Sequence, residues 1–165
     1  MITLQQILKD KWVSLISWEH SPLLLPDLNK ALSILQKHIQ QNHSIWILWD
    51  FDTDWITATS SFILWLRDLF PQITTFYRVP ERNEGHWVNK NNIDYMNSVW
   101  VKLIFTCDNW SNDVEQILYA NSLWIDLIVT DHHQITVENY DYCLINCERK
   151  DSTYPFSHLC WCGIV

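Results

Sequence analysis

The stretch Ile45–Ala58, IWILWDFDTDWITA, decides how the rest of the chain folds. Five apolar residues run without a break and are followed by three aspartates at alternate positions, Asp50, Asp52 and Asp54. A continuous apolar run of this length is typical of a strand that is buried on both faces of a parallel sheet. The stretch therefore predicts a buried strand with an acidic loop at its carboxyl end.

The three aspartates favour a bound divalent metal. Carboxylates this close repel one another, and holding them together away from water would cost several kcal/mol. A cation such as Mg²⁺ or Mn²⁺ removes that cost. The alternative is a solvated acidic loop. We favour the metal because the run directly follows a buried strand, where sites form in open α/β sheets.

Outward from this stretch, strand and helix patterns alternate. Apolar residues at helical spacing predict helices over 28–39, 58–69, 91–98 and 113–121. Segments rich in β-branched and aromatic residues predict strands over 45–49, 73–79, 101–106, 125–130 and 142–145. We therefore expect an α/β fold, with a mainly parallel sheet of about five strands and helices on both faces. Residues 1–20 are expected to form an N-terminal extension and residues 21–165 one domain.

Composition limits the classes of function. The chain has 165 residues, a formal net charge of −8 and 48% hydrophobic residues. No apolar run approaches membrane-spanning length and the N-terminus is no signal peptide, so we expect a cytoplasmic protein without membrane contact. The negative charge argues against wrapping nucleic acid by bulk electrostatics, but it allows an enzyme that reaches phosphates through bound metal.

The five cysteines suit buried free thiols better than a metal site. Four of them lie near the end of the chain, but their spacing is not the paired pattern of a zinc site. The five are Cys107, Cys143, Cys147, Cys160 and Cys162.

Two further clusters follow the ends of predicted strands. Asp108 follows the third strand, and Asp131, His132 and His133 follow the fourth. The carboxyl ends of parallel strands meet at one edge, so these groups should converge with the first acidic cluster. Oxygen ligands with one or two histidines suit Mn²⁺ or Mg²⁺, and two ions could share a bridging carboxylate. Such a pair favours hydrolysis of a phosphoester or phosphoanhydride.

Two other kinds of polar residue are less decisive. Arg82, on the loop after the second strand, either holds a phosphate or is a solvated arginine. The isolated histidines are expected on surfaces or in local hydrogen bonds. They are His20, His38, His43, His86 and His158.

Three motifs, in this order and spacing, resemble those of the DHH phosphoesterase superfamily. They are WDFDTDWITAT, TCDNW and VTDHH. FYRVPERNEGHW and LINCERKDSTYPFSHLCWCGIV also resemble segments of its branch of RecJ-type single-strand-specific exonucleases. The similarity covers residues 20–165, and the motifs together are specific where DHH alone would be weak.

The resemblance implies roles for the acidic and histidine residues. Asp52 and Asp54 would hold metal, and Asp50 would be a further ligand or a close support. Asp108 would bridge two ions and His132 would bind one. His133 would contact the scissile phosphate or assist departure of the leaving group, with Asp131 supporting it, and Arg82 would meet substrate. The implied activity is removal of nucleotides from the 5′ end of single-stranded DNA with Mn²⁺ or Mg²⁺, in DNA repair and recombination.

The chain departs from the family pattern at its glycines. It has 11 Trp and 2 Gly, where average usage near 7% would give about 12 Gly. We hypothesise that UGA codons meaning glycine are read here as tryptophan; a divergent or decayed gene is the alternative. UGG codons at these positions would refute the hypothesis. Tryptophan replaces family glycines at Trp49, Trp55, Trp87, Trp100, Trp110, Trp124 and Trp161.

The family pattern continues past residue 165, so we interpret the chain as an N-terminal fragment that is inactive alone. Three alternatives remain open. Within the superfamily they are an oligonucleotide or cyclic-dinucleotide phosphodiesterase and a pyrophosphatase. Outside enzymes, the alternative is a binding module that keeps the fold without turnover.

Overall fold

The computed structural model describes residues 20–48, 53–78, 89–137, 139, 141–157 and 159. Within them, five parallel strands form one sheet in the order β2-β1-β3-β4-β5. The strands are β1 (Ile45–Leu48), β2 (Thr75–Arg78), β3 (Leu103–Cys107), β4 (Asp126–Thr130) and β5 (Cys143–Ile145). The helices are η1 (Pro22–Leu24), α2 (Leu28–Gln40), α3 (Thr53–Leu69), α4 (Lys90–Ser98) and α5 (Val114–Ser122). The predicted α/β class is confirmed.

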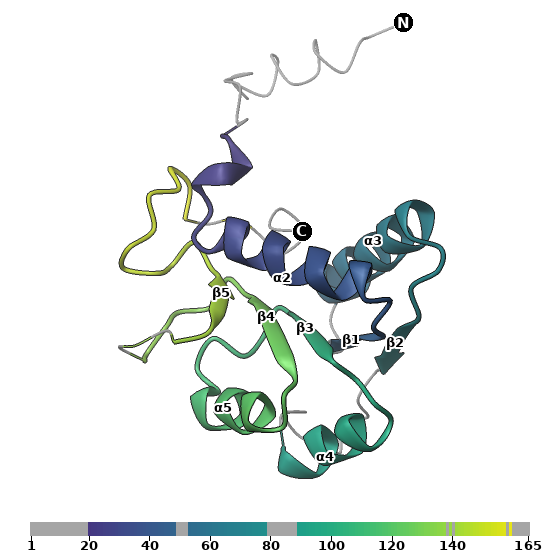
Figure 1. The fold of residues 1–165 in the computed structure, drawn as a ribbon. Helices are drawn as coiled ribbons and strands as arrows, with labels where there is room; N and C mark the ends of the chain where they lie inside the picture. Colours follow the sequence, from purple (N-terminus) through teal and green to yellow (C-terminus); the bar gives the residue numbers. More distant parts are fainter. Residues whose placement is uncertain are drawn as a thin grey trace, which may run out of the picture.

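Helices cover both faces of the sheet, with α2 and α3 on one side and α4 and α5 on the other (Figure 1). Alternate residues of β1 enter the two cores. Ile45 and Ile47 pack with α2 and α3, while Trp46 and Leu48 pack with the α4 and α5 side. Burial on both faces explains the unbroken apolar run in the sequence.

The strand order changes direction next to β1. The chain passes from β1 to β2 on one side, and β3 then lies on the other side of β1. The crevice at such a switch point, outside the carboxyl ends of the strands, is where open α/β sheets bind ligands. β3 precedes Asp108, so Asp108 borders this switch point, while the acidic run that follows β1 in the sequence lies largely outside the described residues.

One helix begins earlier than its apolar face predicts. α3 starts at Thr53, five positions before the expected residue 58. The first turn of a helix exposes unpaired backbone N–H groups, which favour acidic residues, so the apolar face marks only the interior of α3. The other helices and the strands lie within about two residues of their predicted positions.

Three helices end in the same motif, with a left-handed residue just past the last turn. In α2, α4 and α5 the next residue donates its N–H to a carbonyl of the last turn: His43 to His38, Val101 to Met96, and Ile125 to Ala120. This is the Schellman motif, whose left-handed position normally holds glycine or asparagine. The residues there are Asn42 (φ 54°), Trp100 (φ 63°) and Trp124 (φ 60°).

The described cysteines are free and buried, as predicted. They are Cys107, Cys143 and Cys147. Burial raises the pKa of the Cys143 thiol to about 12 and that of Cys147 to about 11, so both stay protonated at neutral pH. Cys160 and Cys162 lie outside the described residues. None of the helices that the structure describes is long and apolar enough for a membrane span.

Candidate metal centre at the carboxyl ends of the strands

Asp108 is the first residue after β3 and lies at the centre of the site. Its backbone N–H donates to the Thr130 carbonyl over 2.9 Å, which extends the pairing of β3 with β4. Its φ of 58° is left-handed, and its side chain is buried. Backbone strain of this kind costs about 1–3 kcal/mol and concentrates at functional sites. A buried carboxylate in a strained turn points to a ligand role.

Asp131 occupies the equivalent position after β4. Its N–H donates to the Ile145 carbonyl over 3.0 Å, which extends the pairing of β4 with β5. The side chain organises the loop that follows. Oδ1 accepts from the backbone N–H groups of His132 (2.8 Å) and His133 (3.1 Å), and Oδ2 accepts from that of Ser111 (3.1 Å).

The Asp131 carboxylate stays ionised despite its burial. Burial alone would raise its pKa, but hydrogen bonds from His133 and Ser111 outweigh burial and hold the pKa below the ordinary value. Asp131 is therefore a fixed negative charge at neutral pH, which suits a residue that orients a histidine.

His132 presents one ring nitrogen to Asp108. Its Nδ1 lies 3.2 Å from the Leu159 carbonyl oxygen, which can only accept, so Nδ1 carries a proton. Its Nε2 lies 2.8 Å from Asp108 Oδ1. In the neutral ring, Nε2 then faces a carboxylate oxygen with its lone pair. A cation bound by both atoms would remove the repulsion between the Nε2 lone pair and the carboxylate oxygen. A backbone carbonyl that accepts from the other ring nitrogen is a common support for a metal-bound histidine.

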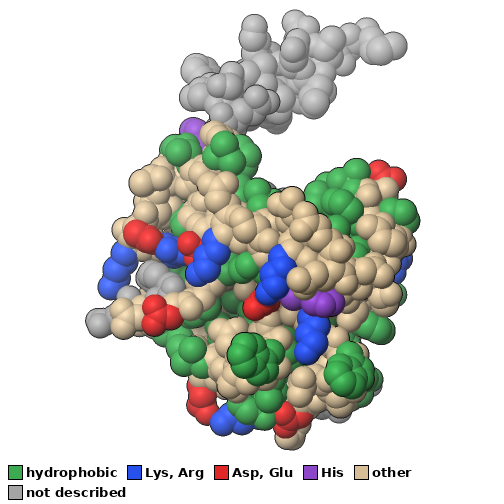
Figure 2. Space-filling view, viewed as in Figure 1, with side chains coloured by type: hydrophobic (Ala, Val, Ile, Leu, Met, Phe, Trp, Pro, Cys, Tyr) green, Lys and Arg blue, Asp and Glu red, His purple; other side chains and the backbone are tan. Residues whose placement is uncertain are grey.

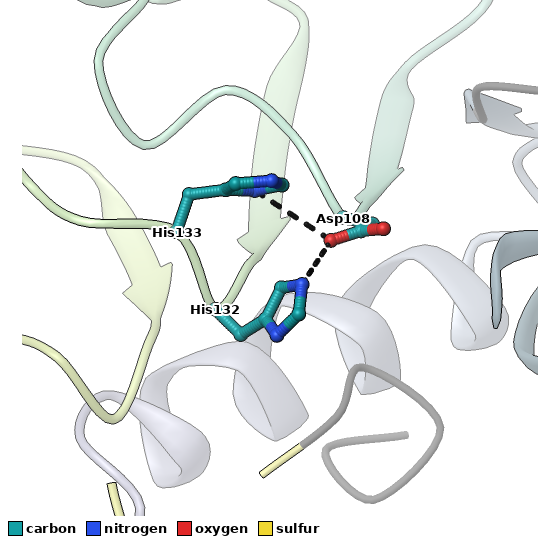
Figure 3. Close-up of side chains that lie close together, drawn as sticks. All are labelled: Asp108, His132 and His133. Carbon is teal, nitrogen blue, oxygen red and sulfur yellow. Dashed lines mark ion pairs between the residues drawn. The ribbon is translucent and has the colours of Figure 1, made fainter. Parts of the chain in front are cut away.

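His133 approaches the same carboxylate from the other side (Figure 3). Its Nδ1 lies 2.7 Å from Asp131 Oδ1 and 3.6 Å from Asp108 Oδ1, and its side chain is 62% exposed. Asp108, His132 and His133 each offer a ligand atom, and these atoms all lie within 4.8 Å of one another. The donor set therefore fits a hard divalent ion such as Mn²⁺ or Mg²⁺.

The structure brings together the predicted site residues whose side chains it describes: Asp108, Asp131, His132 and His133. The remaining ones, Asp50, Asp52 and Arg82 and the side chain of Asp54, lie outside the described residues. β1 ends at Leu48, whose register partner Thr106 lies two positions before Asp108.

One buried polar residue at this edge was not among the residues predicted from the sequence. Asn146 directly follows β5 and is fully buried. The rule that singled out Asp108 and Asp131, a polar residue immediately after a buried strand, also selects Asn146. The amide is a weaker signal than a carboxylate or an imidazole, because it is neutral and is not a preferred metal ligand.

Comparisons with known proteins agree with this geometry. The model of the DHH family, N-terminal domain, matches residues 44–165. The single-stranded-DNA-specific exonuclease RecJ of Bacillus subtilis is 29% identical over 148 residues, which cover 88% of this chain and 19% of that protein. RecJ of Escherichia coli is 29% identical over 144 residues, covering 86% of this chain and 25% of that protein.

Solved structures share the fold. A crystal structure of exonuclease RecJ bound to manganese superposes with a TM-score of 0.73 at 20% identity, covering 88% of this chain and 37% of that one. RecJ from Thermus thermophilus in complex with Mn²⁺ gives a TM-score of 0.67 at 18% identity, covering 85% of this chain and 19% of that one. The chain spans about a fifth to a quarter of the length of the curated relatives named above.

Proposed function

The chain belongs to the DHH family, and from this we propose that it carries the metal centre of a phosphodiesterase that degrades single-stranded DNA from the 5′ end. The observation that carries the proposal is the convergence of Asp108 and His132 on one point, 2.8 Å apart, at the switch point of the sheet. Two separate strand ends deliver these groups, which is the arrangement that a bound cation requires.

We assign the metal site to five side chains, which would hold two Mn²⁺ or Mg²⁺ ions. Bound there, the ions would supply an activated water and neutralise charge that develops on the phosphoryl group. Asp108 would be the ligand that both ions share, because its buried carboxylate lies between both histidines of the motif. The five are Asp50, Asp52, Asp54, Asp108 and His132.

His133 is proposed to contact the substrate phosphate, and Asp131 is proposed to orient the His133 ring. Asp131 accepts from Nδ1 of His133, so Nε2 is the nitrogen that can meet a phosphate oxygen. In its doubly protonated form, which the Asp131 carboxylate stabilises, the largely exposed ring can donate its Nε2 proton to the departing oxygen, and the neutral ring that remains keeps its Nδ1 proton on Asp131. Arg82 is proposed to hold a phosphate through its paired N–H groups.

The proposal is tested by metal binding and by hydrolysis. Titration calorimetry of the chain should show Mn²⁺ binding that is lost in Asp108→Asn, while the exposed Asp94→Asn variant binds as the unaltered chain does. Asp94 lies on α4, on the face of the sheet away from α2 and α3, and bonds Tyr119.

Hydrolysis is measured on 5′-phosphorylated single-stranded and double-stranded oligonucleotides with Mn²⁺. The chain is compared with a longer form in which the seven tryptophans are glycine. Mononucleotide release from single strands, starting at the 5′ end and abolished by Asp108→Asn, supports the proposal. Preference for cyclic dinucleotides or pyrophosphate would reassign the substrate, and Mn²⁺ binding without turnover in either form would favour the binding module.

A further inference from the structure

Asn146 completes a row of three polar residues along the edge of the sheet. Asp108, Asp131 and Asn146 each directly follow one of the neighbouring strands β3, β4 and β5. Unlike the two aspartates, Asn146 carries no charge and is fully buried. A buried amide must find partners for its donors and its acceptor, and here the partners come from three different loops.

The orientation of the Asn146 amide follows from its partners. Nδ2 lies 3.0 Å from the carbonyl oxygen of His133, which can only accept, and 2.9 Å from Ser111 Oγ. Oδ1 lies 2.8 Å from the backbone nitrogen of Glu148, which can only donate. A rotation of the amide by half a turn would break the bonds to His133 and Glu148, so the assignment is unambiguous.

His133 is consequently held at three points. Its carbonyl accepts from Asn146, while its N–H and its ring Nδ1 both donate to Asp131 Oδ1. The loop after β3 is held by the same pair of residues, because the Ser111 N–H donates to Asp131 and Ser111 Oγ contacts Asn146. The Tyr142 hydroxyl donates to the Ser111 carbonyl over 2.6 Å and closes the network.

We infer that Asn146 is a positioning residue, which fixes the His133 backbone so that the ring keeps its bond to Asp131 beside Asp108. The inference rests on the proposed function only for its effect on turnover. Its effect on the His133 ring is independent of any metal or substrate. Asp131 can only accept, so in the unaltered chain the neutral His133 ring carries its proton on Nδ1 rather than on Nε2.

The test compares two variants of the same network. Asn146→Asp keeps the shape and the bond to the Glu148 N–H, but it turns a carboxylate oxygen toward the His133 carbonyl. Ser111→Ala removes one partner of Asn146 and leaves its bond to His133 intact. Both variants lose hydrogen bonds in the same buried network, but only the Asn146 variant loses the bond to the His133 carbonyl. A difference between them therefore reports on the positioning of His133. Asn146→Ser, which leaves room for water, is measured as well, so that a folding failure of the aspartate variant is not decisive.

The primary readout is the ring tautomer of His133, from nitrogen-15 NMR at about pH 8, above the ordinary pKa of histidine. We expect Nδ1 to be protonated in the unaltered chain and in Ser111→Ala, and the proton to be shared between both nitrogens in the Asn146 variants. In the longer, glycine-restored form with Mn²⁺ and a 5′-phosphorylated oligonucleotide, kcat of the Asn146 variants should fall about 10- to 100-fold, the range found when groups that orient the ligands of a metal centre are removed. KM should change little.

Two results overturn the inference. One is a folded Asn146 variant in which His133 keeps its Nδ1 proton, and the other is an equal change in Ser111→Ala. If the longer, glycine-restored form hydrolyses no oligonucleotide, the proposed function fails, but the tautomer in the given chain still decides whether Asn146 positions His133.

Discussion

At the scale of single residues, the three Schellman ends show which positions the backbone reserves for glycine. Asn42 occupies one of them and tolerates a left-handed backbone because its short side chain bonds locally. Trp100 and Trp124 occupy the other two, and their side chains are 77% and 86% exposed. A large side chain there strains the backbone and gains little burial. These two positions favour the hypothesis that the tryptophans stand where glycine belongs.

This predicts that Trp100→Gly and Trp124→Gly each stabilise the protein. A left-handed residue other than glycine costs about 1–2 kcal/mol, part of which the greater freedom of glycine in the unfolded chain offsets. We expect a gain of about 1 kcal/mol for each substitution, measured by urea unfolding. Trp65→Gly is the control: Trp65 lies inside α3 and stacks on Phe62, so glycine there should cost more than about 1 kcal/mol.

A loss of stability in Trp100→Gly or Trp124→Gly equal to that in Trp65→Gly would contradict the glycine interpretation. Trp110 is a different case, because it has a φ of 88° yet is buried. Glycine at this position relieves strain but opens a cavity in the core under α5, so the two effects oppose each other.

How much of the site the sequence could predict is also decided residue by residue. Asp108 and Asp131 could be predicted because each follows an apolar run, a pattern visible without coordinates. The three-point attachment of His133 could not, because Asn146 and Ser111 are distant in sequence and meet only when β3, β4 and β5 align. Pairings of that kind arise from tertiary structure alone.

At the scale of elements, α2 is tied to the sheet at both of its ends. At the C-terminal end, His38 is buried and its Nε2 lies 2.8 Å from Asp126 Oδ2 at the start of β4. His43 lies 3.0 Å from the other ring nitrogen, and Lys37 bonds the same Asp126 oxygen. The prediction of local hydrogen bonds for isolated histidines is confirmed for these two.

The His38 cluster predicts a pH dependence of stability. Burial lowers the pKa of His38 below its ordinary value of 6.5, and this outweighs the opposing effect of Asp126. Below about pH 6.5, His38 therefore binds a proton in the unfolded chain but stays neutral in the folded chain until the pH reaches its lower folded pKa. The free energy of unfolding should fall as pH drops from about 6.5 toward the folded pKa, by at most about 1.4 kcal/mol per pH unit for one group.

His38→Gln removes this titration while keeping a donor for Asp126 and an acceptor for His43. Urea unfolding at several pH values between about 5 and 7 should give a shallower slope for the variant than for the unaltered chain. Equal slopes would mean that His38 is protonated equally in both states, and the burial argument would then be wrong.

At its N-terminal end, α2 is joined to β5 through Asp27. Asp27 directly precedes the first residue of α2, but its side chain caps nothing there. Oδ2 instead accepts from the Leu144 N–H (3.1 Å) and pairs with Arg149 Nη1 (2.9 Å). The Arg149 side chain is 8% exposed, and its guanidinium also donates to the Leu144 carbonyl.

Asp27→Ala should therefore destabilise the protein by about 3 kcal/mol, because it leaves a buried cation short of a partner and a strand N–H unpaired. Asp27→Asn is the matched variant. It retains an oxygen for Leu144 and a residue type that accepts φ near 56°, so it should cost clearly less. Equal losses in thermal unfolding would show that the charge of Asp27 alone matters.

At the scale of the whole molecule, the alternation of strand and helix was sufficient to predict a sheet with helices on both of its faces. The order of the strands was not readable, because periodicity carries no information about which strand lies beside β1. On the face shown in Figure 2, acidic and basic side chains of the described residues are interspersed rather than gathered into a basic patch.

Mn²⁺ should stabilise the folded chain as a whole. A ligand that binds only the folded state adds free energy in proportion to the logarithm of its concentration, about 2.7 kcal/mol at about a hundred times Kd. The thermal midpoint should rise with Mn²⁺ in the unaltered chain and stay constant in Asp108→Asn. A parallel rise in both would indicate binding elsewhere.

The most direct test of the convergence of strand ends on one cation is anomalous X-ray diffraction at the manganese edge from crystals soaked in Mn²⁺. We predict a peak within coordination distance, about 2.0–2.6 Å, of Asp108 Oδ1 and His132 Nε2. Ordered Asp108 and His132 side chains with no manganese between them, or a peak only at another place, would contradict it.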